Sequence, residues 1–463
     1  MLSTYIKHSR AISGLAMPLV LTNFAYVAIA TVDLIMLGTL SALDLAAGGL
    51  AIALFNQLRT MGTGLVTATG NLVASALGRG DYESISKLLN ASFLWATAAG
   101  LLFVALMSLL EKPLILLGQD PQVAAKTVDY LIVVAPGILP CLWFQSIRHF
   151  SVGLKAPGPM LLITLIAVAL TIVLNYGLMF GAWGLPELGF IGVAVATLIV
   201  FIFSFFLFTV IAIKHPVLGR YIHWKFWQTN RQSMRATWKM GLPVAATYGS
   251  EAAFFTILML LVGSIGINEL AAHTVVNQLV YIVFMISAGI SSAASICISE
   301  AHAQHNIVRA RQLGITGICL GIGTMVVIAI PYLLVPEWVL FMFMSADDIR
   351  NSTMLNITVS LVTIAAFLQI FDAGQNIGLG ILRGIGDVKS PLQLSILGYW
   401  IIGLPAAWVA CHLMDLSIQG VWFGLMLGLA VTAISQFILF ISKTHSAGHQ
   451  TIPIPEHIFN RVE

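Results

Sequence analysis

The sequence predicts an all-α polytopic membrane protein with twelve transmembrane helices in two pseudo-twofold-related six-helix bundles. Of its 463 residues, 59% are hydrophobic and only 9% are charged, and the mean hydropathy is +0.95. A soluble domain carries about 25% charged residues, so most of this chain must face lipid or its own core. The apolar residues fall into long runs, and the two halves of the chain repeat each other.

Twelve apolar runs are each long enough to cross a bilayer, which takes about 20 residues of helix. The expected spans are 12–37, 46–72, 88–110, 127–150, 160–180, 189–213, 237–263, 269–297, 310–334, 354–380, 391–412 and 417–442. The loops between them suggest four regions. These are an N-terminal six-helix bundle over 1–213, a polar linker over 214–236, a C-terminal six-helix bundle over 237–445 and a C-terminal tail over 446–463.

The basic residues are distributed unequally between the two ends of these spans. If both termini lie on one side, that side carries 18 of the 22 lysines and arginines, Arg148 and Arg383 among them. Arg59 falls inside a span. The three on the other side are Lys112, Lys126 and Arg350. Because positively charged loops tend to stay in the cytoplasm, we expect both termini and the linker to be cytoplasmic.

The two halves of the chain are internal repeats. An offset of 225 residues places LSALDLAA (40–47) on IGINELAA (265–272) and needs no gap over this region. Other matched pairs are Pro18 with Pro243, Gly38 with Gly263, and Gly64 with Gly289. An even number of spans per repeat gives both halves the same orientation, related by an axis along the membrane normal. Two such bundles facing each other are the architecture of a transporter.

Three carboxylates lie well inside the predicted spans: Glu251, Asp372 and Asp33. An acidic residue at a helix centre costs roughly 2.5 kcal/mol or more, so a chain that keeps one usually uses it to bind, relay or sense a cation. The repeat does not require them, because Glu251 corresponds to Tyr26 and Asp33 to Leu258. The alternative is that a neighbouring helix satisfies Glu251 for packing alone.

Carboxylates that lie close together cannot all stay ionised and unpaired, so together they would hold a proton or a sodium ion strongly. Oxygen ligands suit a hard cation such as Na⁺, and no His/Cys cluster has the spacing of a transition-metal site. The residues alone do not distinguish the two ions. Arg59 either pairs with a carboxylate across the bundle or extends its charge to the membrane surface.

Five segments, in this order along the chain, carry a resemblance to a known family. They are MPLVLTNFAYVAIATVDLIMLG (17–38), SALDLAAGGLA (41–51), NYGLMFGAWGLPELGFIGVAVAT (175–197), GLPVAATYGSEAAFF (241–255) and FDAGQNIGLGILRGIGDVKSP (371–391). Through them the chain resembles the multidrug and toxic compound extrusion (MATE) antiporters, and their NorM-like branch in particular, over nearly its whole length.

The resemblance implies roles for individual residues. Glu251 is similar to the family's carboxylate in span seven, and Asp372 to its aspartate in span ten, before an LRG stretch. Together they would form the cation site of the C-terminal half, where Na⁺ is possible. Asn175 matches a polar neighbour of the cation site in some relatives. Asp33 matches the first-span aspartate that is implicated in coupling and substrate response in the N-terminal half.

The chain departs from the family pattern at two positions. It has Thr171 one turn before Asn175, where some relatives carry asparagine. It has Leu368 one turn before Asp372, where an aromatic residue can occur. These departures leave the choice between Na⁺ and H⁺ open.

As a whole, the resemblance implies a secondary active multidrug efflux antiporter, not an enzyme. It would export cationic or amphipathic drugs across a bacterial inner membrane, in exchange for inward Na⁺ or H⁺, by alternating access. We expect no cofactor besides the coupling ion, a monomer in the lipid bilayer and, at a net charge of only +3, no nucleic-acid partner. One alternative function is that of a lipid-linked precursor flippase of the same superfamily, although a flippase would need a more basic central cavity. A second alternative is a membrane-embedded lipid-modifying enzyme, although no catalytic motif falls on a loop.

Overall fold

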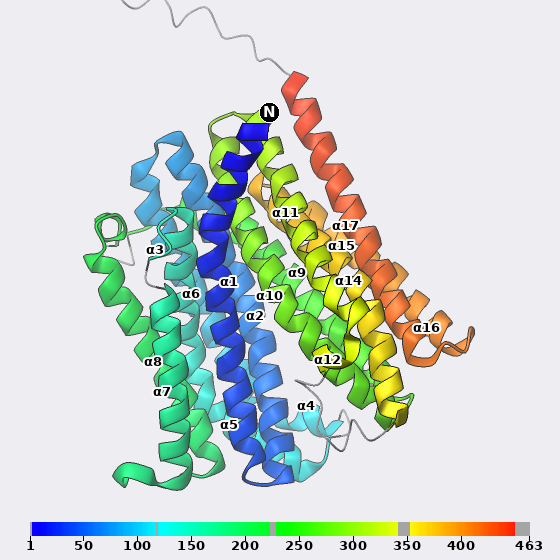
Figure 1. Cartoon of the computed structure of the whole chain (residues 1–463). Helices are drawn as coiled ribbons and strands as arrows, with labels where there is room; N and C mark the ends of the chain where they lie inside the picture. Colours follow the sequence, from blue (N-terminus) through cyan, green and yellow to red (C-terminus); the bar gives the residue numbers. More distant parts are fainter. Residues whose placement is uncertain (1, 117–118, 159, 223–227, 341–351, 450–463) are drawn as a thin grey trace, which may run out of the picture.

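Long helices run side by side through nearly the whole chain (Figure 1). The computed structural model describes residues 2–116, 119–158, 160–222, 228–340 and 352–449. Within these ranges the regular structure is helical throughout. Residues 223–227 of the predicted linker, Arg350 and residues 450–463 of the predicted tail lie outside the described residues.

The N-terminal half contains six membrane-length helical segments. Its helices are α1 (Leu2–Gly38), α2 (Ala42–Arg79), α3 (Tyr82–Ser108), the short α4 (Glu111–Leu116), α5 (Pro121–Val134), α6 (Ile138–Gly153), α7 (Met160–Phe180) and α8 (Phe190–Lys214). Helices α5 and α6 form one span, divided by a 3₁₀ turn over Ala135–Gly137. The turn contains Pro136, which has no backbone N–H to continue an α-helix.

The C-terminal half repeats this order. Its helices are α9 (Arg231–Gly263), α10 (Ile267–Ala303), α11 (Ile307–Leu334), the short α12 (Pro336–Leu340), α14 (Ser352–Gly384), α15 (Lys389–Ile396), α16 (Leu404–His412) and α17 (Ser417–His449). Helices α15 and α16 form one span, joined by a π-helical segment η4 over Leu397–Gly403. Helix α17 continues to His449, so the first four residues of the predicted tail are helical.

Side-chain caps fix where several helices begin. Ser41 accepts a hydrogen bond from the backbone N–H of Asp44 at the start of α2, and Asn230 does the same at the start of α9. Asp81 and Asn306 cap α3 and α11, and these two residues correspond in the repeat. Such oxygens satisfy backbone donors that have no partner within the helix. The repeat therefore preserves the turns as well as the apolar runs.

The structure confirms the predicted fold class. Each of the twelve predicted spans coincides with a helical segment, and eleven of the described helical segments are long and apolar enough to cross a membrane. The remaining segment is α2, which is less apolar because it carries Asn56, Gln57, Arg59 and Asn71. Helix α2 packs against α6 on one side and α9 on the other, so protein rather than lipid surrounds much of it.

The contacts between the two halves repeat about an axis that runs between them. A Cβ atom at Gly64 on α2 would lie 2.8 Å from the Cα of Ala245 on α9. The corresponding residues, Gly289 on α10 and Val20 on α1, make the same close approach, and a Cβ at Gly289 would lie 3.1 Å from the backbone nitrogen of Val20. Such an exchange of partners is what a twofold interface produces. Small residues permit it by letting the backbones approach.

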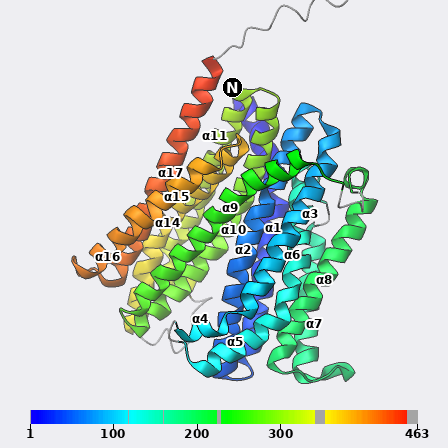
Figure 2. The ribbon, with the colours of Figure 1, turned by 180° about the vertical axis from the view of Figure 1, so that it is seen from behind.

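The two halves are held together mainly at the end that carries the N-terminus. There the amide of Asn71 donates hydrogen bonds to the hydroxyls of Ser295 at 2.7 Å and Ser299 at 2.9 Å. Lys155, after α6, forms an ion pair with Glu300 on α10. Figure 1 shows the helices of the two halves closest at this end and further apart at the other, and Figure 2 shows α9 running beside α2 from behind.

The glycine contacts predict a specific defect. The methyl group added by Gly64→Ala would clash with the backbone of Ala245. We expect this variant to be less stable by about 1–3 kcal/mol, the usual cost of overpacking. Gly14→Ala is the matched control, because nothing lies within 4 Å of its added Cβ. Thermal unfolding in detergent compares the two variants. Equal melting temperatures would show that the halves do not approach closely at Gly64.

A second prediction concerns pH. Asp387, between α14 and α15, is partly buried, which raises the pKa of its carboxyl. Hydrogen bonds from Lys443 and from Ser390 outweigh this and hold the pKa below its ordinary value. A carboxyl with a lowered pKa stabilises the folded state above its unfolded pKa, and that stability is lost as pH falls through the folded value.

We therefore expect Asp387→Asn to lower the melting temperature at pH 7, with a difference from the parent protein that shrinks below about pH 4. Melting temperatures of both proteins across this pH range provide the measurement. A difference that stays constant with pH would contradict the ionic origin of the contact.

Candidate functional site

In the N-terminal half, Asp33 on α1 is buried, with 4% of its surface exposed. Asn175 on α7 donates its amide N–H to one carboxylate oxygen at 2.7 Å. Thr197 on α8 donates its hydroxyl to the other oxygen at 3.1 Å. Both donors are neutral, so the carboxylate is held by hydrogen bonds alone and keeps capacity to accept a proton or a cation.

Further polar atoms around Asp33 are unsatisfied. The amide oxygen of Asn175 and the hydroxyl of Tyr130 are buried and have no hydrogen-bond partner in the described structure. Tyr130 and Thr197 line a cavity of about 40 Å³ with Asp33. Buried polar atoms normally have partners, so this group of oxygens is suited to a water molecule or a hard cation such as Na⁺.

This geometry differs from one grouping that the resemblance implies. In that grouping, Asn175 belongs with the cation-coupling residues Glu251 and Asp372. The structure places Asn175 in the N-terminal half, where α7 packs against α1 and α8 and the amide contacts Asp33. The physical reason is the helix order, because the fifth span packs within its own bundle.

In the C-terminal half, Glu251 on α9 and Asp372 on α14 lie close enough to interact electrostatically. Asp372 is 5% exposed, and Glu251 is half-buried. Both carboxylates also lie within electrostatic range of the Tyr399 hydroxyl. The ring of Tyr399 stacks on Phe254 at a centroid distance of 5.0 Å. Among the described residues, neither carboxylate forms an ion pair. This pair brings together the two residues that the sequence assigned to a cation site.

Unsatisfied polar atoms collect here as well. One oxygen of Asp372, the hydroxyl of Tyr399 and the side-chain amides of Gln375 and Gln436 are buried without partners in the described structure. Gln375 follows Asp372 by one helical turn, and Gln436 on α17 reaches α14 at Gly378, one turn further. Carboxylate, amide and hydroxyl oxygens are ligands for a hard cation, so the residues present fit Na⁺. A proton shared by the two carboxylates fits equally well.

Tyr399 and Gln375 were not identified from the sequence. Tyr399 lies in the π-helical segment η4, and π-helical turns are frequent at functional sites. The available signal was the pair Gly398 and Gly403, both of which pack closely against Gly428 on α17. Tyr399 brings an unpartnered hydroxyl into the electrostatic range of both carboxylates from another helix.

The arginines of the core differ from expectation. Arg59 forms no ion pair with a carboxylate of the described residues, and its Nε donates instead to the amide oxygen of Asn56 at 3.0 Å. Arg148 and Arg383, assigned to the cytoplasmic surface, are buried, with 8% and 5% of their surfaces exposed. They lie where the two halves meet, and Arg383 contacts the hydroxyl of Tyr248 on α9. Packing between the halves covers both side chains.

A close contact of glycines sets the register between the later helices of the two halves. A Cβ at Gly153 on α6 would lie 2.6 Å from the carbonyl oxygen of Gly70. A Cβ at Gly384 on α14 would lie 3.0 Å from that of Ser295, and Ser295 corresponds to Gly70 in the repeat. Helix α6 therefore corresponds to α14 with Gly153 on Gly384.

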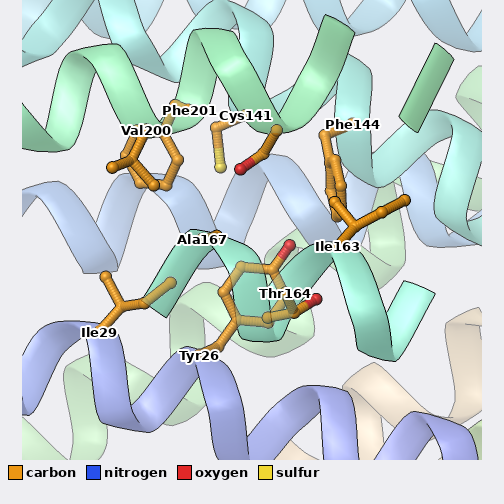
Figure 3. A pocket seen from close by; sticks show the side chains of 10 residues that line it. Tyr26, Ile29, Cys141, Phe144, Ile163, Thr164, Ala167, Val200 and Phe201 are labelled. Carbon is orange, nitrogen blue, oxygen red and sulfur yellow. The ribbon is translucent and has the colours of Figure 1, made fainter. Parts of the chain in front are cut away.

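In this register Cys141 occupies the position of Asp372, and at the offset of 225 residues that relates the first helices of the two halves, Tyr26 occupies that of Glu251. Figure 3 shows Tyr26 and Cys141 pointing into one pocket, whose other walls include Ile29, Phe144 and Val200. The N-terminal half thus has an apolar pocket with a phenol and a thiol where the C-terminal half has two carboxylates.

Comparison with known proteins identifies the family. The family model MatE matches residues 18–177 and 243–409, and these segments begin at the two prolines that the repeat aligns. The chain is 33% identical over 433 residues to the probable multidrug resistance protein NorM of Rhizobium meliloti, with 93% of each chain covered. It is 31% identical to the protein of the same description from Pseudomonas putida, with 92% of each covered.

Solved structures show the same fold. A multidrug resistance MATE family transporter in an outward-facing conformation superposes with a TM-score of 0.85 at 18% identity, covering 95% of this chain and 97% of that one. A eukaryotic MATE transporter superposes at 0.83 and 18% identity, covering 96% and 99%. The chain belongs to the MatE family, and its NorM-like resemblance is confirmed. Membership places it among transporters rather than enzymes.

The Asp33–Asn175 contact predicts an energetic coupling. Asn175→Ala leaves one buried carboxylate oxygen without a donor, a loss of about 1–3 kcal/mol. When Asp33→Asn is already present, Asn175→Ala should cost less, and the double-mutant cycle should show coupling of about 0.5–3 kcal/mol. Unfolding in detergent measures all four proteins.

The matched control is Thr209→Val, because Thr209 is buried on the neighbouring helix α8 and its hydroxyl donates to the carbonyl of Phe205 within that helix. It should show no coupling to Asp33→Asn. Equal coupling in the two cycles would mean that Asp33 destabilises the bundle generally and has no specific bond to Asn175.

Proposed function

We propose that the protein exports cationic or amphipathic drugs in exchange for an inward flow of Na⁺ or H⁺. The curated relatives are described as probable multidrug resistance proteins, which supports drugs as the transported compounds. The bacterial origin of these relatives supports a bacterial inner membrane. The excess of basic residues at one end supports placing both termini and the linker in the cytoplasm. The proposed active form is a monomer, because one chain contains both bundles and the interface between them.

The observation that carries the proposal is the pair Glu251 and Asp372. These two carboxylates lie near each other, have no cationic partner in the described structure and lie next to unpartnered hydroxyl and amide oxygens. Binding a proton or Na⁺ would relieve the repulsion between their negative charges. Asp33 with Asn175 and Thr197 is proposed as a second coupling site in the other half. Both departures from the family pattern, Thr171 and Leu368, are buried beside these groups on α7 and α14.

The arrangement of the halves supports alternating access. The contacts at Gly64, Gly289 and the Lys155–Glu300 ion pair close the end that carries the N-terminus. With the proposed orientation, this arrangement faces the outside, and the opposite state would separate these contacts. Coupling requires the cation and the drug to prefer different states, since a ligand with equal affinity for both shifts nothing. Cation binding at Glu251 and Asp372 favours the drug-released state in this scheme.

A lipid-linked precursor flippase is the second candidate, and one observation favours it. The membrane-embedded part contains Arg148 and Arg383 in addition to Arg59, so it is more basic than the sequence indicated. Several guanidinium groups suit a phosphate headgroup. Against this, the carboxylates at Glu251, Asp372 and Asp33 would repel such an anion.

Transport by purified protein in liposomes tests the proposal. A Na⁺ gradient and a proton gradient are imposed separately, with ethidium as the drug. We expect one of the two gradients to drive uphill accumulation, because cation binding at the carboxylates is coupled to drug release. Glu251→Gln should remain folded and reduce driven transport to the level of liposomes without protein.

Glu269→Gln, at the start of α10, is the matched control and should retain driven transport. Normal driven efflux by a well-folded Glu251→Gln protein would falsify the role of this carboxylate. If neither gradient moves ethidium in the parent protein, drug antiport fails and the flippase takes its place. Transport driven by Na⁺ alone would assign the site to Na⁺, and transport driven by protons alone would assign it to H⁺.

A further inference from the structure

Arg59 brings a positive charge into the N-terminal half where the two halves meet. Two residues before it on α2, Gln57 donates its amide to the carbonyl of Gly249 on α9 at 3.4 Å. The guanidinium carbon of Arg59 lies 5.9 Å from the centre of the Tyr26 ring, and the side chain also reaches Cys141. Guanidinium has five N–H donors, so most of them remain available to a ligand in the described structure.

A second guanidinium lies beside the same ring. Arg148 on α6 has its guanidinium carbon 5.8 Å from the centre of Tyr26. It donates to the amide oxygens of Asn23 at 2.6 Å and Gln145 at 3.3 Å, while its Nε is buried without a partner. Neither arginine has a carboxylate partner among the described residues. Arginines within membrane spans are costly and usually mark a binding site or pathway.

Opposite charges face one cavity without pairing. Arg59 lines the same cavity as Asp33, together with Tyr26 and the apolar rings of Phe55 and Phe201. The oxygens of Asp33 accept their hydrogen bonds from other residues. Asp33 follows Tyr26 by seven residues on α1, which places these two residues roughly 10 Å apart along the helix, and Arg59 lies against the Tyr26 ring. The wall of this cavity is therefore negative at Asp33 and positive at Arg59.

We propose that Arg59 binds the carboxylate of zwitterionic aromatic substrates, whose ammonium group lies toward Asp33. This assignment rests on the proposed drug-export function and names a substrate class for it. A planar guanidinium binds a planar carboxylate through two parallel hydrogen bonds, which a lysine does not reproduce. Tyr26 orients the group by lying against both arginines, and Arg148 adds to the positive potential.

The size of the cavity limits how the substrate binds. At about 40 Å³, it holds water molecules rather than a whole drug. The charged ends of the substrate displace those waters, and its body lies between the two halves. A purely cationic drug makes no use of Arg59, so the residue selects among substrates and is not required for coupling.

Equilibrium binding in detergent tests the assignment, and it needs no ion gradient. The two probes are a fluoroquinolone, which is a zwitterion, and its ethyl ester, which keeps the amine and loses the carboxylate. The parent protein should bind the acid about 10- to 100-fold more tightly than the ester, as expected for hydrogen bonds between charged groups. Arg59→Gln should bring this ratio close to one, and Arg59→Lys should leave an intermediate ratio.

The exposed Arg309→Gln is the matched control and should keep the ratio of the parent protein. The assignment is overturned if the parent protein does not distinguish acid from ester, including the case in which it binds neither. It is also overturned if Arg59→Gln keeps the parent ratio, or if inorganic pyrophosphate competes with the acid as strongly as unlabelled acid does. These outcomes are independent of liposome transport of ethidium, whose failure would overturn the export function instead.

Discussion

A carboxylate in the hydrocarbon region of a bilayer has no water to stabilise its charge, so it depends entirely on neighbouring protein atoms. Among the residues that the structure describes, the acidic side chains of the core are not neutralised by the basic ones. Asp33 relies on neutral donors from α7 and α8, and Glu251 and Asp372 lie beside each other. The arginines contact Tyr26 and Tyr248 instead, and Arg59 forms no ion pair with Asp33 although both line one cavity. Charges that are kept apart in this way stay available to mobile ions and ligands.

The packing of glycines makes this separation possible. Where Gly64 meets Ala245 and Gly289 meets Val20, the backbones touch and the two halves are joined without polar side chains. The polar residues of α2 then lie on either side of the Gly64 contact. Asn71 lies toward the end of the molecule that carries the N-terminus, and Arg59 lies toward the middle of the molecule. A bulkier contact would separate the halves and expose both groups. The two close contacts thus determine where the polar residues of α2 lie relative to the other half of the molecule.

Hydropathy and the repeat predicted the spans, because burial in lipid requires long apolar helices wherever they lie in the bundle. They also identified Glu251, Asp372 and Asp33, since a charge within such a run is conspicuous. The sequence did not predict the burial of Arg148 and Arg383, which lie near helix ends and become covered only when the two halves pack. It also missed Tyr399, because a π-helical turn shifts the register of the residues that follow it. The sequence did not indicate that Asn175 contacts Asp33, because matching a motif does not specify which carboxylate an amide contacts.

The reciprocal contacts of Gly64 with Ala245 and of Gly289 with Val20 also bear on the origin of the chain. Each half has an even number of spans and the same orientation, so a half-length ancestor could have paired with a second copy of itself through this surface. Identical copies would have carried identical residues at the positions of Tyr26 and Glu251. Because both halves of this protein belong to one chain, they can differ, and one half has a pair of acids where the other has a phenol and a thiol. The asymmetry of charge in this protein is thus something that a symmetric pair of identical chains could not have.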